Sequence, residues 1–162
     1  MSPAKSPRQS QIILNTLMMP EHANHFGNVH GGIIMKLADE AAAIAAMRHA
    51  QKPCVTVAMD SMTFKQPVHI GEIVTCTATV TYAHRSSMEV SVEVTAEEPI
   101  TGKVTLTNSA HLVFVALDEN ERPTSVPEVL LSTEQERVAW VEGKARQEAR
   151  LARRKADKER RR

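Results

Sequence analysis

Apolar and polar residues alternate with a period of two through the middle of the chain. Between Ile73 and Tyr82, for example, threonines occupy every second position and apolar residues stand between them. Successive side chains of a strand point to opposite faces, so this alternation predicts antiparallel strands with one buried face. The connections between the runs have the length of hairpin loops. The predicted strands are Gln11–Met19 at an edge, Val55–Phe64, Ile73–Tyr82, Met88–Thr95 and Val104–Leu117.

A different pattern separates the first two strands. Residues Ile33–Ala50 contain no Gly or Pro and consist largely of residues that favour helices. At 100° per residue, one stripe of this helix is apolar and rich in alanine: Ile34, Leu37, Ala38, Ala41, Ile44 and Ala45. The Lys52–Pro53 step ends the helix, because proline disfavours helical geometry in the residue before it. The sequence therefore predicts an α+β fold in which a curved sheet of about five strands wraps around one long central helix.

The ends of the chain differ from the body. We expect residues 1–9 to be disordered, residues 10–126 to form the folded domain, and residues 127–162 to form a linker and a charged helical tail. Thr133 can cap that helix together with Glu136, but beyond Leu151 no apolar face remains, and we expect fraying or disorder there. Residues 1–133 carry a net charge of −4 and residues 134–162 of +5. The body therefore has no general affinity for polyanions, and no specific nucleic-acid partner is expected.

Several classes of protein are excluded by composition. The length of 162 residues predicts one domain. No apolar run approaches the roughly 20 residues of a membrane span, and the N-terminus lacks the apolar centre of a signal peptide. Cys54 and Cys76 are the only cysteines and do not form a CxxC pair, so neither a disulfide framework nor a zinc site is indicated. We expect a cytoplasmic protein with no metal, no cofactor and no membrane partner.

Asp39 is the residue from which a chemical interpretation starts. It lies in the middle of the predicted helix, where an unpaired carboxylate is costly if it is buried. The neighbouring Glu40 is placed to pair with Lys36, four residues before it. Taken alone, Asp39 is more readily interpreted as a helix-surface or interface carboxylate than as a functional one.

The loop before the helix is the second unusual feature. Gly31 and Gly32 stand at the expected helix N-terminus, where free N–H groups and the positive end of the helix dipole lie, and they allow an acyl carbonyl to approach the backbone closely. Asn28 is placed to cap the helix, and His25 and His30 are interpreted as loop structure because no third metal ligand accompanies them.

These residues together resemble a known family. The run N-H-x-G-x-x-x-G-G from Asn24 to Gly32, followed seven residues later by Asp39, is similar to the hotdog-fold acyl-CoA thioesterases, in particular their broad-specificity cytosolic acyl-CoA hydrolase branch. The stretches FKQPVHIGEIV at Phe64–Val74 and RSSMEV at Arg85–Val90 fit the same branch. The resemblance covers Gln11–Val126 and does not include the basic tail.

The resemblance implies hydrolysis of acyl-CoA thioesters to free fatty acid and coenzyme A. It implies that Asp39 acts as general base or nucleophile, that Asn24 helps to place the water or the carbonyl, and that backbone N–H groups near Gly31 and Gly32 polarise the carbonyl. It also implies a homodimer with acyl-CoA bound between the subunits, assembling further to a hexamer (a trimer of dimers) or a tetramer.

The same resemblance implies that Arg85, Ser86 and Ser87 lie near the CoA phosphates, a role that suits an arginine accompanied by hydroxyls and turn N–H groups. The sequence departs from the family at His84, where a glycine is expected before the arginine. That departure bears on the shape of this turn.

Spacing adds an argument of its own. Gly32 and Asp39 are seven residues apart, or roughly 10 Å along a helix, which is long for one substrate atom to touch both within one subunit. We therefore expect Asp39 to reach a carbonyl held by a neighbouring chain. No G-x-S-x-G motif is present, so a serine triad of the α/β-hydrolase kind is excluded.

Two other functions remain open at this stage. A non-catalytic acyl-CoA-binding regulator on the same fold would need neither Asp39 nor Asn24. A hydratase on a similar fold would want an Asp–His pair, for which His30 and Asp39 are the candidates and are poorly spaced.

Overall fold

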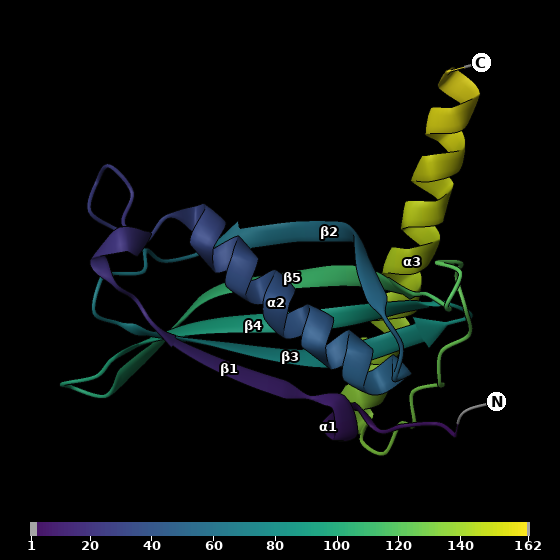
Figure 1. The fold of residues 1–162 in the computed structure, drawn as a ribbon, viewed down its shortest axis with the longest axis horizontal. Helices are drawn as coiled ribbons and strands as arrows, with labels where there is room; N and C mark the ends of the chain where they lie inside the picture. Colours follow the sequence, from purple (N-terminus) through teal and green to yellow (C-terminus); the bar gives the residue numbers. More distant parts are fainter. Residues whose placement is uncertain (1–2, 162) are drawn as a thin grey trace.

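A computed structural model describes residues 3–161 and contains one sheet of five antiparallel strands. The strand order is β1-β3-β4-β5-β2, so β1 and β2 form the two edges (Figure 1). Every predicted strand is present, with ends shifted by three residues at most. The elements in chain order are α1 (Pro7–Ser10), β1 (Ile12–Leu17), the 3-10 turn η1 (Pro20–His22), α2 (Gly31–Ala50), β2 (Cys54–Phe64), β3 (Ile73–His84), β4 (Ser87–Glu98), β5 (Lys103–Ala116) and α3 (Glu134–Arg160).

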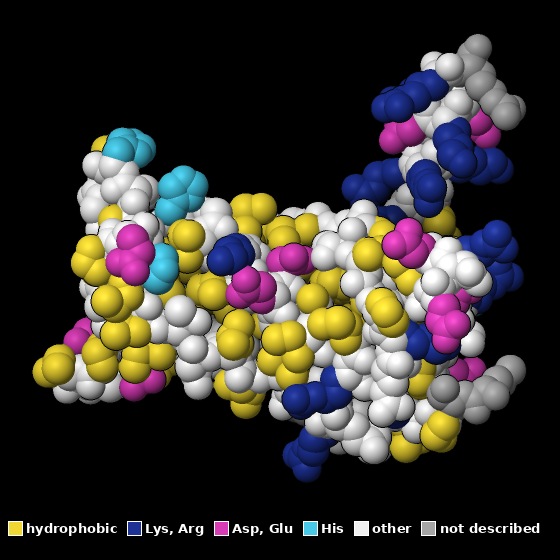
Figure 2. Space-filling model, in the orientation of Figure 1, with side chains coloured by type: hydrophobic (Ala, Val, Ile, Leu, Met, Phe, Trp, Pro, Cys, Tyr) yellow, Lys and Arg dark blue, Asp and Glu magenta, His cyan; other side chains and the backbone are white. Residues whose placement is uncertain are grey.

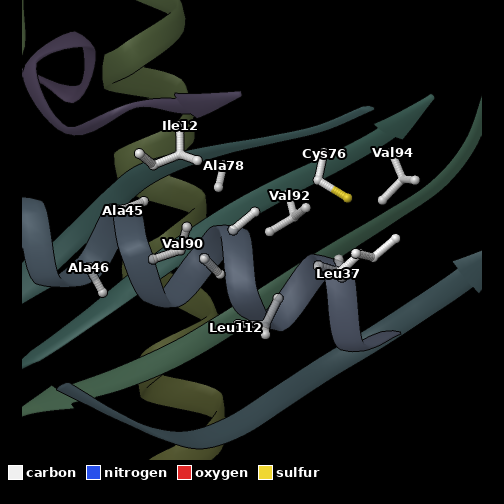
Figure 3. Packing of buried hydrophobic residues seen from close by; sticks show 14 of the residues in the cluster. Ile12, Leu37, Ala45, Ala46, Cys76, Ala78, Val90, Val92, Val94 and Leu112 are labelled. Carbon is white, nitrogen blue, oxygen red and sulfur yellow. The ribbon is translucent and has the colours of Figure 1, made fainter. Parts of the chain in front are cut away.

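The central helix α2 lies across one face of the curved sheet, and the core fills the space between them (Figures 1 and 3). Alanines of α2 bring its backbone close to Val90, Val92 and Leu112 of β4 and β5, all of which are completely buried. This arrangement confirms the predicted fold class. The predicted burial of the stripe is wrong for one residue. Ile44 remains 38% exposed, because it stands at the margin of the stripe, where the strands no longer cover the helix.

The C-terminal helix α3 packs on the opposite face of the sheet (Figure 1). The helix approaches the sheet closely at Gly143, where an added Cβ would lie 2.8 Å from the Tyr82 Cβ and 2.9 Å from a carboxylate oxygen of Glu89. The capping box of Thr133 and Glu136 is present as predicted. The expected fraying after Leu151 is wrong, since the helix continues to Arg160. Strong helix formers such as Ala, Arg, Lys and Glu extend a helix that packing has already nucleated.

The final part of α3 projects away from the body. Every residue from Leu151 to Arg161 is exposed, and Lys and Arg side chains gather there (Figure 2). No helix within residues 3–161 is long and apolar enough to cross a membrane.

The N-terminal segment is more ordered than its composition suggested. Residues 1 and 2 lie outside the described part of the chain, but Pro7–Ser10 forms the short helix α1, so the expected disorder is wrong there. Lys5 pairs with the linker before α3: its N–H donates to the Glu128 carbonyl at 3.0 Å, and its own carbonyl accepts from Leu130 at 2.8 Å. Long-range pairing of this kind leaves no mark in the local pattern of hydrophobicity.

Candidate active site

The glycine-rich loop and the first turn of α2 line a cavity of about 330 Å³. Asn24 and Gly31 contribute to its wall, together with Phe64 at the end of β2 and Asn108 of β5. Two of the residues implicated from the sequence are therefore brought together here. The remaining lining residues are Asn28, Val29, Ile34, Lys65, Gln66, Pro67 and Val68.

Asn24 is fixed by the loop that it begins. Its Oδ1 accepts hydrogen bonds from the N–H of Phe26 at 2.9 Å and of Asn28 at 3.2 Å. Its backbone N–H donates to the Asn28 carbonyl at 2.7 Å, which closes the loop. Because the side-chain oxygen is occupied, the amide Nδ2 is the group with which Asn24 can act, and Nδ2 is a hydrogen-bond donor.

The N-terminus of α2 is capped by His30, not by Asn28 as expected. The Nδ1 atom of His30 accepts a hydrogen bond from the Gly32 N–H at 2.9 Å. The N–H of Gly31, the first residue of the helix, has no partner within the helix, as the geometry of a helix end requires. An added Cβ at Gly31 would lie 3.2 Å from the Phe64 ring, so this residue also provides room for the ring.

Asp39 lies on the side of α2 that faces the edge strand β2. Its Oδ1 accepts a hydrogen bond from the hydroxyl of Thr56 at 2.8 Å. The neighbouring Glu40 pairs with Lys36 at 3.7 Å, as the sequence predicted. The Asp39 carboxylate therefore has a defined orientation, but unlike Glu40 it forms no ion pair with a lysine or arginine among the described residues.

Sequence reasoning missed Thr56. It is the one polar residue in the apolar run Val55-Thr56-Val57, and a strand places alternate side chains on the same face. The side chain of Thr56 therefore lies on the opposite face of the strand from Val55 and Val57. A helix that covers this face brings Asp39 and Thr56 together.

Within one copy of the chain, Asp39 does not line the cavity that contains Asn24. The residues predicted to act together are thus divided between two places on the same helix: the loop and first turn at one, and Asp39 with Thr56 at the other. This division agrees with the spacing argument made from the sequence.

The residues predicted to bind CoA lie at the turn between β3 and β4. Arg85 occupies the left-handed region with φ of 54°, and its exposed guanidinium makes no hydrogen bond within residues 3–161. Ser87 donates its hydroxyl to the His84 carbonyl at 3.1 Å, and the Ser86 carbonyl accepts from Ala116 at 2.9 Å. The departure from the family at His84 leaves a tight two-residue turn in place. Ser87 also lines a cavity of about 530 Å³ together with residues of β2, β5 and α3.

Other kinds of nucleophile and ligand are not favoured. Burial raises the pKa of Cys54 and Cys76 to about 11, so neither thiol is ionised near neutral pH. Within the described residues, no group of three or more His, Cys, Asp or Glu side chains is arranged to hold a metal ion. Asp39 is a carboxylate base on the helix that follows the loop.

Comparison with known proteins fits this arrangement. Residues 26–103 match the family model of the thioesterase superfamily. The uncharacterized acyl-CoA thioester hydrolase YkhA of Bacillus subtilis is 36% identical over 129 residues, which cover 80% of this chain and 75% of the relative. This chain belongs to the acyl-CoA thioesterase family.

Solved structures of this family have the same fold over nearly the whole chain. The acyl-CoA hydrolase of Staphylococcus aureus, solved with butyryl coenzyme A, coenzyme A and coenzyme A disulfide, is 37% identical, with a TM-score of 0.89 over 97% of this chain and 96% of that one. A hexameric acyl-CoA thioesterase is 36% identical, with a TM-score of 0.88 over 93% of this chain and 97% of that one. In both structures the matched region extends beyond the sheet and α2.

Proposed function

We propose that this protein hydrolyses acyl-CoA thioesters to a carboxylic acid and coenzyme A, with Asp39 as the reacting carboxylate. The observation that carries the proposal is the Asp39 carboxylate, held by Thr56 on the central helix of a chain whose relatives are named acyl-CoA hydrolases. Its carboxylate is oriented through one oxygen by Thr56, which leaves the other oxygen to meet a water or the thioester. A thioester is activated enough for a carboxylate to serve either as general base or as nucleophile.

The S. aureus hydrolase supports this assignment. It has been solved with an aspartate, an asparagine and a threonine each replaced by alanine. In that enzyme's numbering the aspartate follows the asparagine by 15 positions and precedes the threonine by 17. Asp39 stands 15 positions after Asn24 and 17 before Thr56. The same three residue types at the same two spacings favour Asn24, Asp39 and Thr56 as one functional set.

The carbonyl oxygen of the thioester is bound at the start of α2 in this proposal. The unpaired N–H of Gly31 and the amide Nδ2 of Asn24 are both donors beside one cavity, and donors aimed at a developing oxyanion are a principal source of catalysis. The Gly32 N–H was the other predicted donor. It becomes available only if the His30 ring turns away, because Nδ1 of that ring occupies it.

The CoA moiety is assigned to the turn between β3 and β4. Arg85 offers a guanidinium that makes no hydrogen bond within residues 3–161, and Ser86 offers a hydroxyl beside it in the chain. The Ser87 hydroxyl can donate to a phosphate only if it leaves the His84 carbonyl. The cavity beside Ser87 is also lined by Arg150 and Arg154 of α3. The nucleotide end of the substrate therefore meets several cationic side chains at this end of the sheet.

The complete site forms between two copies of the chain. β2 is an edge strand with unpaired backbone groups, and exposed edges are managed in proteins by pairing or covering them. Val55 and Val57 on this strand are 44% and 54% exposed, and Met35 and Met47, on the same stripe of α2 as Asp39, are 42% and 41% exposed. A second copy paired along β2 covers these side chains and brings its own Asp39 toward the Asn24 cavity. Further assembly to a hexamer is supported by the hexameric relative.

Both cysteines of the chain are free, which is consistent with a reducing compartment, and we assign the protein to the cytoplasm.

Release of free thiol from a panel of acyl-CoAs of different chain lengths tests the function. Wild-type protein is expected to turn over at least one of them, and Asp39→Ala is expected to lose most of kcat while remaining folded. Thr56→Val, which removes the donor to Asp39, is expected to lower kcat by roughly tenfold. The matched control is Glu40→Ala, the neighbouring carboxylate on the same helix, which is expected to retain activity.

Two results contradict the proposal. Near-normal kcat in Asp39→Ala removes the catalytic assignment. Tight binding of acyl-CoA with no thiol release from any member of the panel identifies the protein as a binding regulator.

A further inference from the structure

Asn108 is the unusual residue of the cavity beside Asn24. It lies on β5 opposite Phe64 of β2 and Val94 of β4, with its side chain on the face of the sheet that is covered by α2. The residue is completely buried, and its Oδ1 atom has no hydrogen-bond partner among residues 3–161. Buried polar groups in proteins are almost always hydrogen-bonded, so this oxygen points to a ligand that the cavity receives.

The orientation of the Asn108 side-chain amide follows from the hydrogen bond that its nitrogen makes. Nδ2 donates to the carbonyl of Thr63 at 3.2 Å. Turning the amide over would set Oδ1 against that carbonyl oxygen, two acceptors facing each other. Oδ1 is therefore the atom left without a partner. Any group that satisfies it must be a hydrogen-bond donor inside a cavity that also contains Asn24 and Gly31.

The substrate itself offers no such donor at its reacting end. A thioester carbon, oxygen and sulfur carry no N–H or O–H, and the first donor of acyl-CoA is an amide N–H of the pantetheine arm. Water, the second substrate of hydrolysis, carries two O–H groups. A water that gives one proton to a carboxylate base keeps one O–H, which needs an acceptor to set its direction.

From these observations we infer that Asn108 binds the attacking water of the proposed hydrolysis through Oδ1. The water oxygen bonds to the carbonyl carbon, one proton passes to Asp39 of a second copy, the C–S bond breaks, and the departing thiolate takes up a proton. If Asp39 instead attacks first, the same water hydrolyses the acyl-enzyme intermediate. The inference rests on the proposed function and adds to it a residue that holds the water.

Substitution of Asn108 with measurement of kcat and KM tests the inference. Asn108→Leu keeps a similar shape without a polar atom, and we expect kcat to fall by tenfold to about a hundredfold with KM changed less than twofold. Asn108→Asp is expected to restore most of kcat. Burial raises the pKa of a carboxyl group, and a protonated carboxyl donates to Thr63 while its other oxygen accepts, as the amide does.

The matched control is Thr107→Val, at the neighbouring position on the same strand. Thr107 is also buried, but its hydroxyl is satisfied by the Val94 carbonyl at 3.1 Å, and it does not line the cavity. This variant is expected to lower thermal stability without lowering kcat. If Asn108→Leu does not fold, Asn108→Ala, which adds no bulk, replaces it and is expected to show the same loss of kcat.

A second substrate distinguishes water from the pantetheine amide. The S-acyl thioester of 3-mercaptopropionate has no N–H, so a water-binding role predicts the same fold-loss in kcat as with the acyl-CoA. A loss confined to acyl-CoA overturns the inference in favour of amide binding. It is equally overturned if kcat stays within twofold of wild type, or if only KM or thermal stability changes. Absence of hydrolysis by the wild-type protein rejects the proposed function itself and is distinct from all of these results.

Discussion

Arg146 of α3 donates two hydrogen bonds to Glu89 of β4, at 2.9 Å and 2.8 Å, and the Glu89 side chain is only 1% exposed. Burial alone raises the pKa of Glu89, but the hydrogen bonds and charge of Arg146, with smaller contributions from His111 and Thr81, outweigh it and hold this pKa below its usual value. The pair fixes α3 to the outer face of the sheet. A second pair, between Arg150 and Asp60, lies one turn further along α3.

Removal of one partner of this ion pair is expected to be strongly destabilising. Arg146→Met keeps the length of the side chain but removes the two hydrogen bonds and the nearer cation from a buried carboxylate, which costs about 3 kcal/mol of unfolding free energy. Arg150, 3.9 Å from Glu89, remains as the second cation. Denaturant unfolding of the single variant and of the double variant Glu89→Gln/Arg146→Met measures this. The double variant is expected to lose less than the single one; an equal or larger loss would show that the pair is not coupled.

Two truncations separate the anchored part of α3 from its exposed end. A chain ending at Arg150 keeps both ion pairs, and because all residues beyond it are exposed, its melting temperature is expected to stay within a few degrees of the full chain. A chain ending at Lys144 loses Arg146 and Arg150 and is expected to melt at clearly lower temperature. Circular dichroism during heating compares them. Equal melting of both truncations would mean that the anchor contributes nothing.

These contacts show where sequence reasoning stopped. The alternation of β4 identified its buried face correctly. It gives no sign that a distant helix covers Glu89 on the opposite, polar face. The sequence predicted a charged helical tail, and its anchors, Arg146 and Arg150, look like ordinary solvated residues of such a tail. Pairing between residues 57 positions apart is a tertiary fact that no local pattern contains.

For similar reasons, the sequence identified only some of the residues of the candidate site. Asn24, Gly31 and Asp39 were found because they belong to one motif within a short stretch of chain. Thr56 and Asn108 lie on strands, where threonine and asparagine look like ordinary polar positions. Only the register of β2 and β5 reveals that the first meets Asp39 and the second is buried without a partner.

Stability is expected to fall on acidification below pH 6.5 because of the buried His49 and the half-buried His111. Burial lowers the pKa of both His49 and His111, so the folded state disfavours their protonated forms. Their contribution is complete above the unfolded pKa of 6.5 and is lost as the pH falls below it. Each group then adds a slope of at most about 1.4 kcal/mol per pH unit.

Denaturant unfolding of the wild type and of His49→Gln between pH 7 and pH 5 measures this slope. His49 is completely buried and hydrogen-bonded to the Pro127 carbonyl at 3.0 Å, so the variant is expected to be less stable at pH 7 but less sensitive to acid. His25→Gln, at an exposed position, is the control and should keep the wild-type slope. A slope unchanged in His49→Gln would remove His49 from this explanation.

Arg85→Ala is expected to raise KM for acyl-CoA by roughly tenfold, the effect of losing one charge-assisted hydrogen bond to phosphate. KM for the matching acyl-pantetheine thioester, which has no nucleotide phosphates, should not change. Steady-state kinetics on the two substrates provide the measurement. Lys103→Ala, an exposed cation at a different hairpin, serves as the control. Equal effects of Arg85→Ala on both substrates would mean that the guanidinium does not touch those phosphates.

The proposed division of the site between two copies makes the sharpest prediction. Asn24 lines the cavity at the start of α2, whereas Asp39 lies about two turns further along the helix and outside that cavity. In the proposed two-fold dimer, each site would take Asn24 from one chain and Asp39 from the other. Asn24→Ala and Asp39→Ala are each expected to be inactive alone. In a dimer of one variant with the other, one site carries both substitutions and the other carries neither.

Mixing the two inactive variants is therefore expected to restore activity. Random pairing makes about half of the dimers mixed, each with one intact site of two, so about a quarter of wild-type activity should return. Differently tagged variants, purified as the mixed dimer with its composition confirmed by mass, should recover about half. If both residues of a site came from one chain, every site would carry one defect. A purified mixed dimer with no activity would accordingly reject the shared site, while leaving Asp39→Ala and Asn24→Ala as tests of the residues themselves.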